Sequence, residues 1–195
     1  MPRTARLSRK TNETAIEVTV DLDGRGTAEV ATGVGFFDHM LNHLAKHSRI
    51  DIRMACTGDL HIDAHHTVED CGLALGQAIR QALDDKAGIS RYGDATVPMD
   101  ETLVTAAIDL SGRPVFVWKA EVPLETLGTF SSQLGEEFLR AFAVAVGMNL
   151  HVVLHHGRNT HHILEGIFKA VARALRVAVS LDPGGDGIPS TKGVL

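Results

Sequence analysis

The sequence predicts an α+β protein built by tandem duplication of one β-β-α-β-α unit. The first indication is a repeated pentapeptide, because residues 65–69 read HHTVE and residues 161–165 read HHILE, 96 positions later. The second is that apolar residues recur at helical spacing after each copy, so each copy should begin a helix. The third is that strands and helices precede both copies in the same order, as a duplication requires.

The first half-repeat is assigned to residues 1–90. Its expected elements, in order, are a β-hairpin of strands at 15–20 and 27–34, a helix at 36–47, a strand at 50–57 and a helix at 64–84. Alternating apolar and polar residues indicate the hairpin, and the Gly-Arg-Gly sequence at 24–26 supplies its turn. The segment Lys86-Ala87-Gly88 ends the pentapeptide helix.

The second half-repeat is assigned to residues 91–182. Its expected elements are strands at 94–99, 101–110 and 114–122, a helix at 131–146, a strand at 149–155 and a helix at 160–180. This half therefore has one strand more than the first. Since helices can cover one face of each small sheet, we expect the helix layers to pack against each other between the two sheets.

Residues 183–195 form a tail rich in glycine and proline. Such a tail is usually disordered, and the residues alone favour that interpretation. If another part of the chain held the tail in place, however, Ser190, Thr191 and Lys192 would form a compact anion clasp.

Composition excludes several classes of protein. The 195 residues carry a net charge of −5 with a pI near 6.1, and no basic run suggests a nucleic-acid partner. Neither a signal-peptide core nor a membrane-spanning stretch is present. The two cysteines, Cys56 and Cys71, form no CxxC pair and fit a reducing compartment. We therefore expect a cytoplasmic protein.

The pentapeptide has the residue types of a metal site. Positions four apart share a helix face, so His65 and Glu69 should project together while His66 faces elsewhere. An imidazole and a carboxylate form half of an N/O metal shell, and one copy could serve two different ions. A single HHxxE would be explained by chance, but two equivalent copies favour a site. The residue types alone allow zinc, iron, cobalt or manganese.

The helix before each pentapeptide offers further ligands. His39, His43 and His47 recur at every fourth position of the first such helix and so share one face. His43 also fits simple packing against a carboxylate. The matching helix of the second half has no histidine and offers Glu136 and Glu137 instead.

Seven blocks of the chain carry a resemblance to a known family. They are FDHMLNH at 37–43, DAHHTVED at 63–70, RYG at 91–93, PMDE at 98–101, DLSGRP at 109–114, FKA at 168–170 and PSTKG at 189–193. Together, from about Arg6 to Lys192, they resemble imidazoleglycerol-phosphate dehydratase. This resemblance implies a fold of the ribosomal protein S5 domain 2-like type. It also implies a hydro-lyase of histidine biosynthesis that converts D-erythro-imidazole-glycerol phosphate to imidazole acetol phosphate, and a 24-mer with active sites between subunits.

The resemblance further implies two manganese ions per active site. One ion would be bound by His39, His66, His161 and Glu165, and the other by His65, Glu69, His162 and Glu137, with Glu136 as an alternative to Glu137. The substrate would contact Glu13, His39, His47, His65, Glu69 and His161. Its phosphate would be bound by Arg91, Arg113, Lys169, Ser190, Thr191 and Lys192, so the resemblance favours an ordered tail.

Two proton carriers are needed for the dehydration. Glu13 is the first candidate and His47 the second, while Asp100, Glu101 and a metal-bound water remain open. Two other functions also remain open. A binuclear metal-dependent hydrolase would use a similar shell. A non-enzymatic metal-sensing or metal-storage protein would explain the eleven histidines, but it would leave Arg91 and Arg113 without a role.

Overall fold

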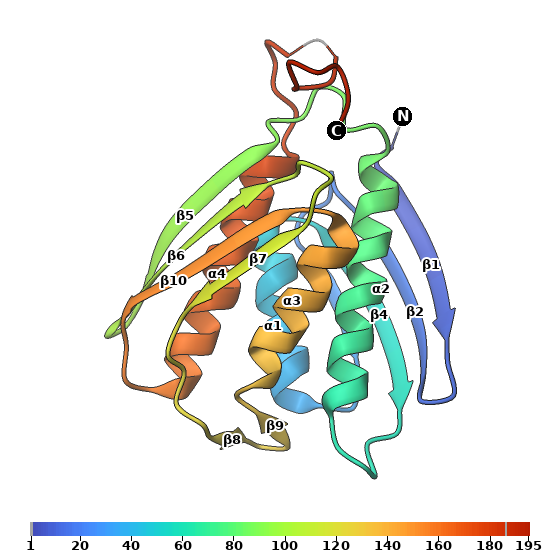
Figure 1. Ribbon diagram of the computed structural model, residues 1–195. Helices are drawn as coiled ribbons and strands as arrows, with labels where there is room; N and C mark the ends of the chain where they lie inside the picture. The colour runs from blue at the N-terminus through green and yellow to red at the C-terminus, as the bar shows by residue number, and fades with distance from the viewer. Residues whose placement is uncertain (1, 186) are drawn as a thin grey trace.

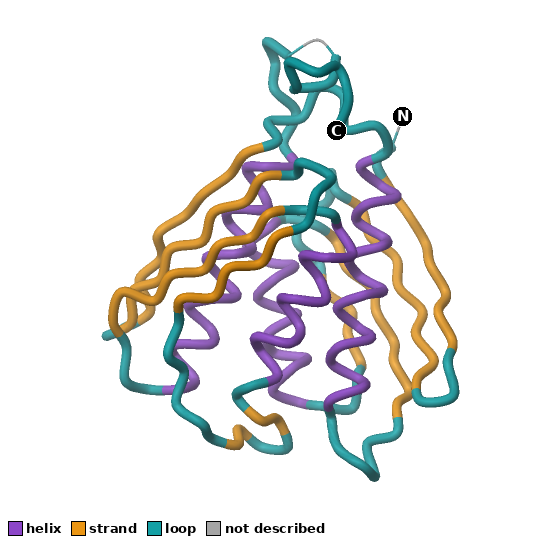
Figure 2. The backbone as a smooth tube through the Cα atoms, in the orientation of Figure 1, coloured by secondary structure: helices purple, strands orange, loops and turns teal. Residues whose placement is uncertain are grey.

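In the part of the chain that the structure describes, two four-stranded sheets form the outer layers, and four helices lie between them (Figure 1, Figure 2). This computed structural model describes residues 2–185 and 187–195, so residue 1 of the first half-repeat and residue 186 of the tail lie outside the described residues. The α+β class and the helix layers between sheets are confirmed. No helix in these ranges is both long enough and apolar enough to cross a membrane.

The first half contains β1 (Thr4–Lys10), β2 (Thr14–Asp21), β3 (Ala28–Ala31), α1 (Gly35–Ser48), β4 (Asp51–Gly58) and α2 (His65–Leu83). Its strand order is β1-β2-β4-β3, with β3 parallel to β4. The predicted hairpin of 15–20 with 27–34 is therefore wrong. The Asp51 carboxylate accepts hydrogen bonds from the N–H groups of Arg25 and Thr27 at 2.8 and 2.7 Å. These bonds hold the segment between β2 and β3 across the start of β4. Strand β3 therefore pairs with the edge of β4 opposite to β2.

Strand β1 was not among the predicted elements. Its side chains alternate between exposed and half-buried, and most of them are polar or cationic. An edge strand of this kind carries little apolar alternation, so periodicity does not reveal it. With β1 included, the repeated unit is β-β-β-α-β-α, and the main sheet of each half has four strands.

The second half contains β5 (Tyr92–Met99), β6 (Thr102–Asp109), β7 (Val115–Lys119), α3 (Leu134–Val146), β10 (Asn149–His156) and α4 (Thr160–Val179). A short pair, β8 (Thr126–Leu127) and β9 (Phe130–Ser131), precedes α3. The strand order is β5-β6-β10-β7, with β7 parallel to β10. Both halves therefore share one topology, which is the structural mark of the duplication.

Each helix packs against a helix of the other half, α1 against α4 and α2 against α3. The α2–α3 contact is close, because a Cβ atom at Gly76 would lie 2.6 Å from Cβ of Ala145 and 2.8 Å from the carbonyl oxygen of Phe142. Fully buried phenylalanines, including Phe138 and Phe168, fill the space between the layers. All four helices begin at the end of the molecule that carries β8 and β9, while the tail lies at the other end (Figure 1).

Candidate functional site

Each pentapeptide lies at the start of a helix whose free N–H groups are bound by a neighbouring side chain. The Asn159 side chain accepts hydrogen bonds from the N–H groups of His161 and His162 at 2.9 and 3.2 Å. In the first half, Asp63 accepts one from the N–H of His65 at 2.7 Å. Such caps satisfy donors that the helix itself cannot pair. They therefore fix the first turns from which the imidazoles project.

Packing of α1 against α4 brings three predicted ligands together. Nε2 of His161 lies 3.1 Å from Oε2 of Glu165, and Nε2 of His39 lies 3.4 Å from the same oxygen. His43 joins this group, with its Nε2 at 3.4 Å from Oε1 of Glu165. One ligand atom each from His39, His43 and Glu165 lies within 4.8 Å of the others.

The charges of this cluster suit a divalent cation. Burial opposes ionisation of Glu165, but Lys169, His43 and His161 outweigh it and lower its pKa to about 2. Burial lowers the pKa of His43 to about 4, so its ring is neutral at pH 7 and keeps a lone pair. Neutral imidazoles beside a carboxylate are donors that Mn²⁺, Zn²⁺ and Fe²⁺ all accept. The chemistry of the donor set thus fits a metal ion.

His66, which was predicted to bind the same ion as His39, does not join the cluster. Its Nδ1 lies 2.9 Å from Oδ2 of Asp59, and its Nε2 lies 3.8 Å from Oε1 of Glu13. The hydrogen bond to Asp59 raises the pKa of His66. One chain therefore supplies His39, His161 and Glu165 at one place and His66 at another.

The second predicted shell is divided in the same way. Nε2 of His65 lies 3.8 Å from Oε2 of Glu69, as expected for residues one helical turn apart. His162 instead places its Nδ1 2.7 Å from Glu101 and its Nε2 3.5 Å from Asp100. Neither predicted shell is complete within the described part of one chain.

The two glutamates at the start of α3 form ion pairs with Arg140. Oε2 of Glu137 lies 3.8 Å from Nε of Arg140, and Oε1 of Glu136 lies 2.5 Å from NH2 of the same arginine. Both glutamates lie in the first turn of α3. Their place in the second half therefore corresponds to that of His39, which lies near the start of α1.

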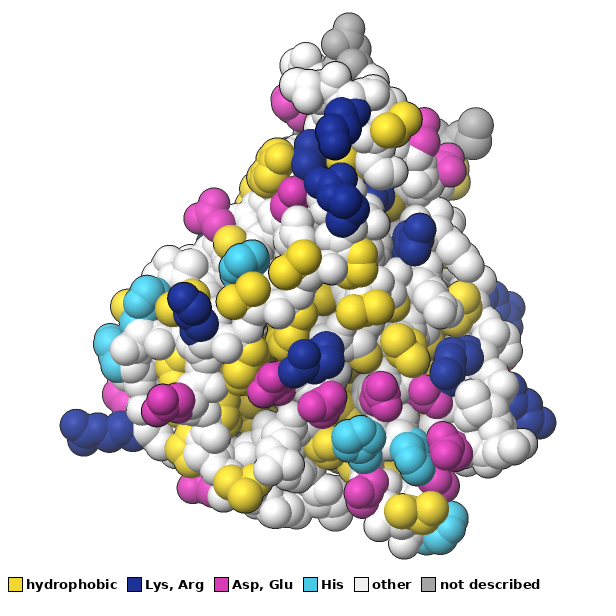
Figure 3. All heavy atoms as spheres, viewed as in Figure 1, with side chains coloured by type: hydrophobic (Ala, Val, Ile, Leu, Met, Phe, Trp, Pro, Cys, Tyr) yellow, Lys and Arg dark blue, Asp and Glu magenta, His cyan; other side chains and the backbone are white. Residues whose placement is uncertain are grey.

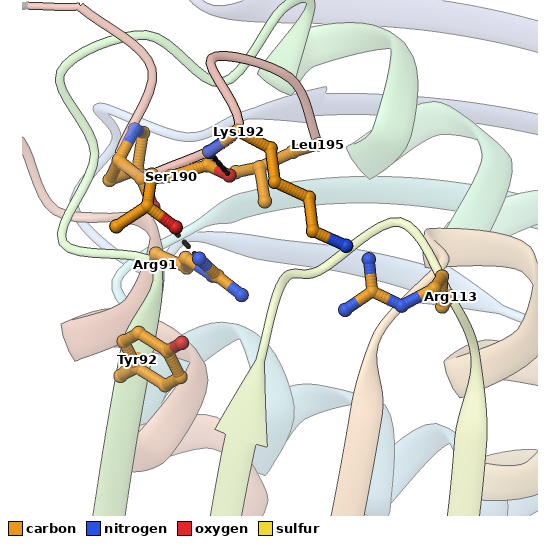
Figure 4. A pocket seen from close by; sticks show the side chains of 8 residues that line it. Arg91, Tyr92, Arg113, Ser190, Lys192 and Leu195 are labelled. Carbon is orange, nitrogen blue, oxygen red and sulfur yellow. Dashed lines mark hydrogen bonds between the residues drawn. The ribbon is translucent and has the colours of Figure 1, made fainter.

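A cavity of about 590 Å³ lies at the tail end of the molecule (Figure 4). It is lined by Arg91, Tyr92, Arg113, Pro189, Ser190, Thr191, Lys192 and Leu195. Arg91 donates to both carboxylate oxygens of Asp109, at 2.7 and 3.2 Å, and to the carbonyl oxygen of Pro189 at 2.8 Å. Arg91 therefore holds the described tail residues against the body of the protein, which spacing alone could not indicate.

The cavity is strongly cationic. Figure 4 shows the Lys192 amino group and the Arg113 guanidinium pointing toward each other, with the Arg91 guanidinium directed to the same space. Like charges that face one another favour an anion between them. Figure 3 shows lysine and arginine gathered at this end of the visible face, and histidine with acidic residues gathered at the opposite end.

Lys169, which was predicted to bind the phosphate, lies outside this cavity, and so does His47, a candidate proton carrier. Nζ of Lys169 lies 2.5 Å from Oε1 of Glu165 and 3.3 Å from the sulfur of Met99, so it belongs with the histidine cluster. His47 lines a separate cavity of about 460 Å³ together with Gly24, Arg25, Lys46, Arg49, Arg173 and Arg176. Burial and the nearby cations lower the pKa of His47.

The histidine cluster and the tail cavity are far apart within one chain. The N–H of Arg91 donates to the carbonyl oxygen of Ala178 at 2.9 Å, which places Arg91 level with that residue of α4. Glu165 precedes Ala178 by 13 positions on the same helix. At about 1.5 Å per residue, this is a separation of roughly 20 Å along the helix.

Sequence reasoning missed one of the residues described above. Asp59 follows β4 directly and contacts His66, but an isolated aspartate seven positions before a histidine carries no recognisable signal. The position that follows β10 in the second half is Gly157, so the repeat offers no help either.

Comparison with known proteins gives a consistent result. The family described as imidazoleglycerol-phosphate dehydratase matches residues 32–175. Proteins of that name from Cereibacter sphaeroides and Rhodopseudomonas palustris are 60% and 58% identical over 194 residues, covering 99% of this chain and 100% and 98% of those relatives. The crystal structure of the Staphylococcus aureus enzyme matches with a TM-score of 0.83 and 36% identity, covering 92% of this chain and 99% of that one. The Pyrococcus furiosus enzyme, in complex with (S)-C348, matches with a TM-score of 0.82 and 34% identity, covering 97% and 100%.

Proposed function

The chain belongs to the imidazoleglycerol-phosphate dehydratase family, and we propose that its active site is completed only where copies of the chain meet. As a family member it is a hydro-lyase, EC 4.2.1.19, that removes water from a small-molecule substrate, imidazoleglycerol phosphate, in histidine biosynthesis. Membership decides against the metallohydrolase and the metal-storage protein. The family is metal-dependent, and the His39, His43 and Glu165 cluster is a possible metal site.

One observation carries the proposal of a shared site. The substrate has three carbons between its ring and its phosphate, whereas the histidine cluster and the tail cavity are separated by roughly 20 Å of α4. A single copy cannot hold the ring at one and the phosphate at the other. A second copy that brings its tail cavity to the first copy's histidine cluster would resolve this.

We assign two manganese ions to each such site. The first would be bound by His39, His66, His161 and Glu165, and the second by His65, Glu69, His162 and Glu137. The separation of His66 from His39 and of His162 from His65 supports ligands from different copies. It also supports a large homo-oligomer, for which 24 subunits and a cytoplasmic location remain predictions.

Removal of the metal is expected to reduce assembly and activity together. If the ions join ligands from different copies, a chelator removes the bonds that hold the copies at the site. Size-exclusion chromatography with multi-angle light scattering would report the mass before and after chelation, and again after manganese is restored. An unchanged mass with complete loss of manganese would contradict metal-linked assembly.

The substrate phosphate is assigned to Arg91, Arg113, Ser190, Thr191 and Lys192 of one copy, with Lys169 supplied by another. Arg113 and Lys192 supply charge, and Arg91 both supplies charge and holds the tail through Pro189. Hydrogen bonds to an anion from such groups are stronger than neutral ones. A protein of net charge −5 needs a local cationic pocket of this kind for an anionic substrate.

Arg113→Ala is expected to raise the KM roughly 10- to 100-fold, because a charge-assisted hydrogen bond contributes about 1.5–3 kcal/mol. The measurement is steady-state kinetics with imidazoleglycerol phosphate. Arg6→Ala is the matched control, since that side chain is exposed and pairs only with Glu17 at 3.6 Å among the interactions described for it. A KM unchanged in both variants would remove Arg113 from the phosphate site.

The chemistry requires that a proton leave a carbon that is not acidic. When bound, a divalent ion stabilises the deprotonated form of a coordinated ring at neutral pH and so makes the ring a better electron donor. We assign the two proton carriers to Glu13 and His47, with Glu13 as the first choice. Glu13 lies beside His66, a proposed ligand, at 3.8 Å. The lowered pKa of His47 leaves its ring neutral at pH 7 and able to accept a proton.

A further inference from the structure

The second histidine of each pentapeptide is held by a carboxylate at its Nδ1 atom. Nδ1 of His66 lies 2.9 Å from Oδ2 of Asp59, and Nδ1 of His162 lies 2.7 Å from Oε2 of Glu101. An ionised carboxylate can only accept a hydrogen bond, so Nδ1 must carry the proton. In the neutral ring, Nε2 then keeps its lone pair and can bind a cation.

The two carboxylates come from different parts of the duplicated unit. Asp59 follows β4, and the matching position after β10 is Gly157. Glu101 directly precedes β6, and the matching residue before β2 is Glu13, which faces the other ring nitrogen of His66. Duplication of one loop therefore does not account for both contacts. The same pairing therefore arises by a different route in each half.

Glu101 is held in place from two sides. Its Oε1 accepts hydrogen bonds from the N–H groups of Arg158 and Asn159 at 3.0 and 2.8 Å, which leaves Oε2 for His162. The carboxylate cannot rotate away without losing these backbone hydrogen bonds.

The Asp59 side chain makes one hydrogen bond within the described residues. Its Oδ2 accepts a hydrogen bond from Nδ1 of His66 at 2.9 Å. Its Oδ1 is buried and has no hydrogen-bond partner among the described residues. Asp59 is therefore committed to His66 and to no second group in this part of the chain.

We propose that Asp59 and Glu101 are positioning residues that fix the tautomer and the ring orientation of His66 and His162, so that Nε2 of each ring binds the metal ion. This inference rests on the metal centre proposed above. A carboxylate behind a metal-binding imidazole restricts its rotation and makes the other nitrogen a stronger ligand. The first histidines, His65 and His161, are paired differently, each with the glutamate one turn further along its own helix.

The test begins with Glu101→Gln. The N–H groups of Arg158 and Asn159 retain the amide oxygen, so the amide nitrogen faces Nδ1 of His162 and drives the proton to Nε2. Asparagine at position 59 could turn its oxygen toward His66, so Asp59→Ala is the stronger variant and Asp59→Asn the milder one. Affinity is measured by equilibrium dialysis of the full-length protein, with Mn²⁺ as the only ligand added.

We expect Glu101→Gln and Asp59→Ala to bind Mn²⁺ roughly 10- to 100-fold more weakly than the wild type, and Asp59→Asn to show a smaller loss. Glu29→Gln is the matched control, because Glu29 lies on β3 and pairs with Arg53 at 3.3 Å. Its Mn²⁺ affinity should not change. Wild-type affinity in both Glu101→Gln and Asp59→Ala would overturn the positioning role.

Nitrogen-15 NMR of histidine-labelled, metal-free protein reads the tautomers directly. His66 and His162 should carry the proton on Nδ1 in the wild type, and His162 should carry it on Nε2 in Glu101→Gln. Protonation of the wild-type rings on Nε2 would overturn the inference, even if a variant fails to fold. Expected tautomers in a wild type that binds no divalent ion would instead contradict the proposed metal centre.

Discussion

Glu13→Gln is expected to lower kcat by about 10²- to 10⁴-fold, the usual contribution of a proton carrier, because an amide cannot take up or release the proton. Glu13 lies in the turn between β1 and β2, its side chain is 52% exposed, and its Oε1 is 3.8 Å from Nε2 of His66. An exposed carboxylate beside a proposed ligand can reach a substrate that arrives from another copy. Manganese content and phosphate binding should remain at wild-type levels.

Ketone formation from imidazoleglycerol phosphate would measure turnover of this variant, and elemental analysis would measure manganese. The matched control is Glu17→Gln, since Glu17 lies on β2, is similarly exposed at 55% and pairs with Arg6. Near-normal turnover in Glu13→Gln would remove Glu13 from the chemistry and leave His47, Asp100 and Glu101 as candidates.

His66→Ala and His162→Ala should each lower the manganese stoichiometry and abolish most of the activity. Each substitution removes one imidazole from a different proposed shell, His66 from the first and His162 from the second. Each variant is therefore expected to lose one of the two proposed ions. Elemental analysis of the purified variants, with light scattering for their mass, gives both readouts.

His151→Ala is the matched control for these substitutions, since His151 is exposed on β10 and lies outside the pentapeptides. It should retain manganese and activity. Unchanged manganese content in both His66→Ala and His162→Ala would contradict the crossed assignment of ligands. A loss of both ions in each variant would instead indicate that the two shells form cooperatively.

Long periodic elements were predictable from the sequence, whereas strand pairing was not. The helices expected at 36–47 and 160–180 correspond to Gly35–Ser48 and Thr160–Val179, because their apolar faces pack into one core. The position of β3 depends on hydrogen bonds from Arg25 and Thr27 to Asp51, more than 20 residues further along the chain. The pattern of apolar and polar residues within a strand does not predict a hydrogen bond between such distant residues.

The candidate site divides along the same line. Helical spacing alone predicted that the two histidines of a pentapeptide face different ways, and in each copy the two rings contact different carboxylates. It could not predict that Asp59 contacts His66 and that Glu101 contacts His162. Those contacts depend on how the segment after β4 and the turn before β6 fold against the helices. The docking of the tail on Arg91 is likewise a contact between distant segments.

Residue order was sufficient to establish the family, the duplication and the side chains able to bind a cation, because these follow from motifs and from helix geometry within a few residues. Tertiary structure was needed to place the histidine cluster and the tail cavity at opposite ends of one chain. That separation arises because Glu165 lies near the start of α4, whereas Arg91 is hydrogen-bonded to Ala178 near the end of the same helix.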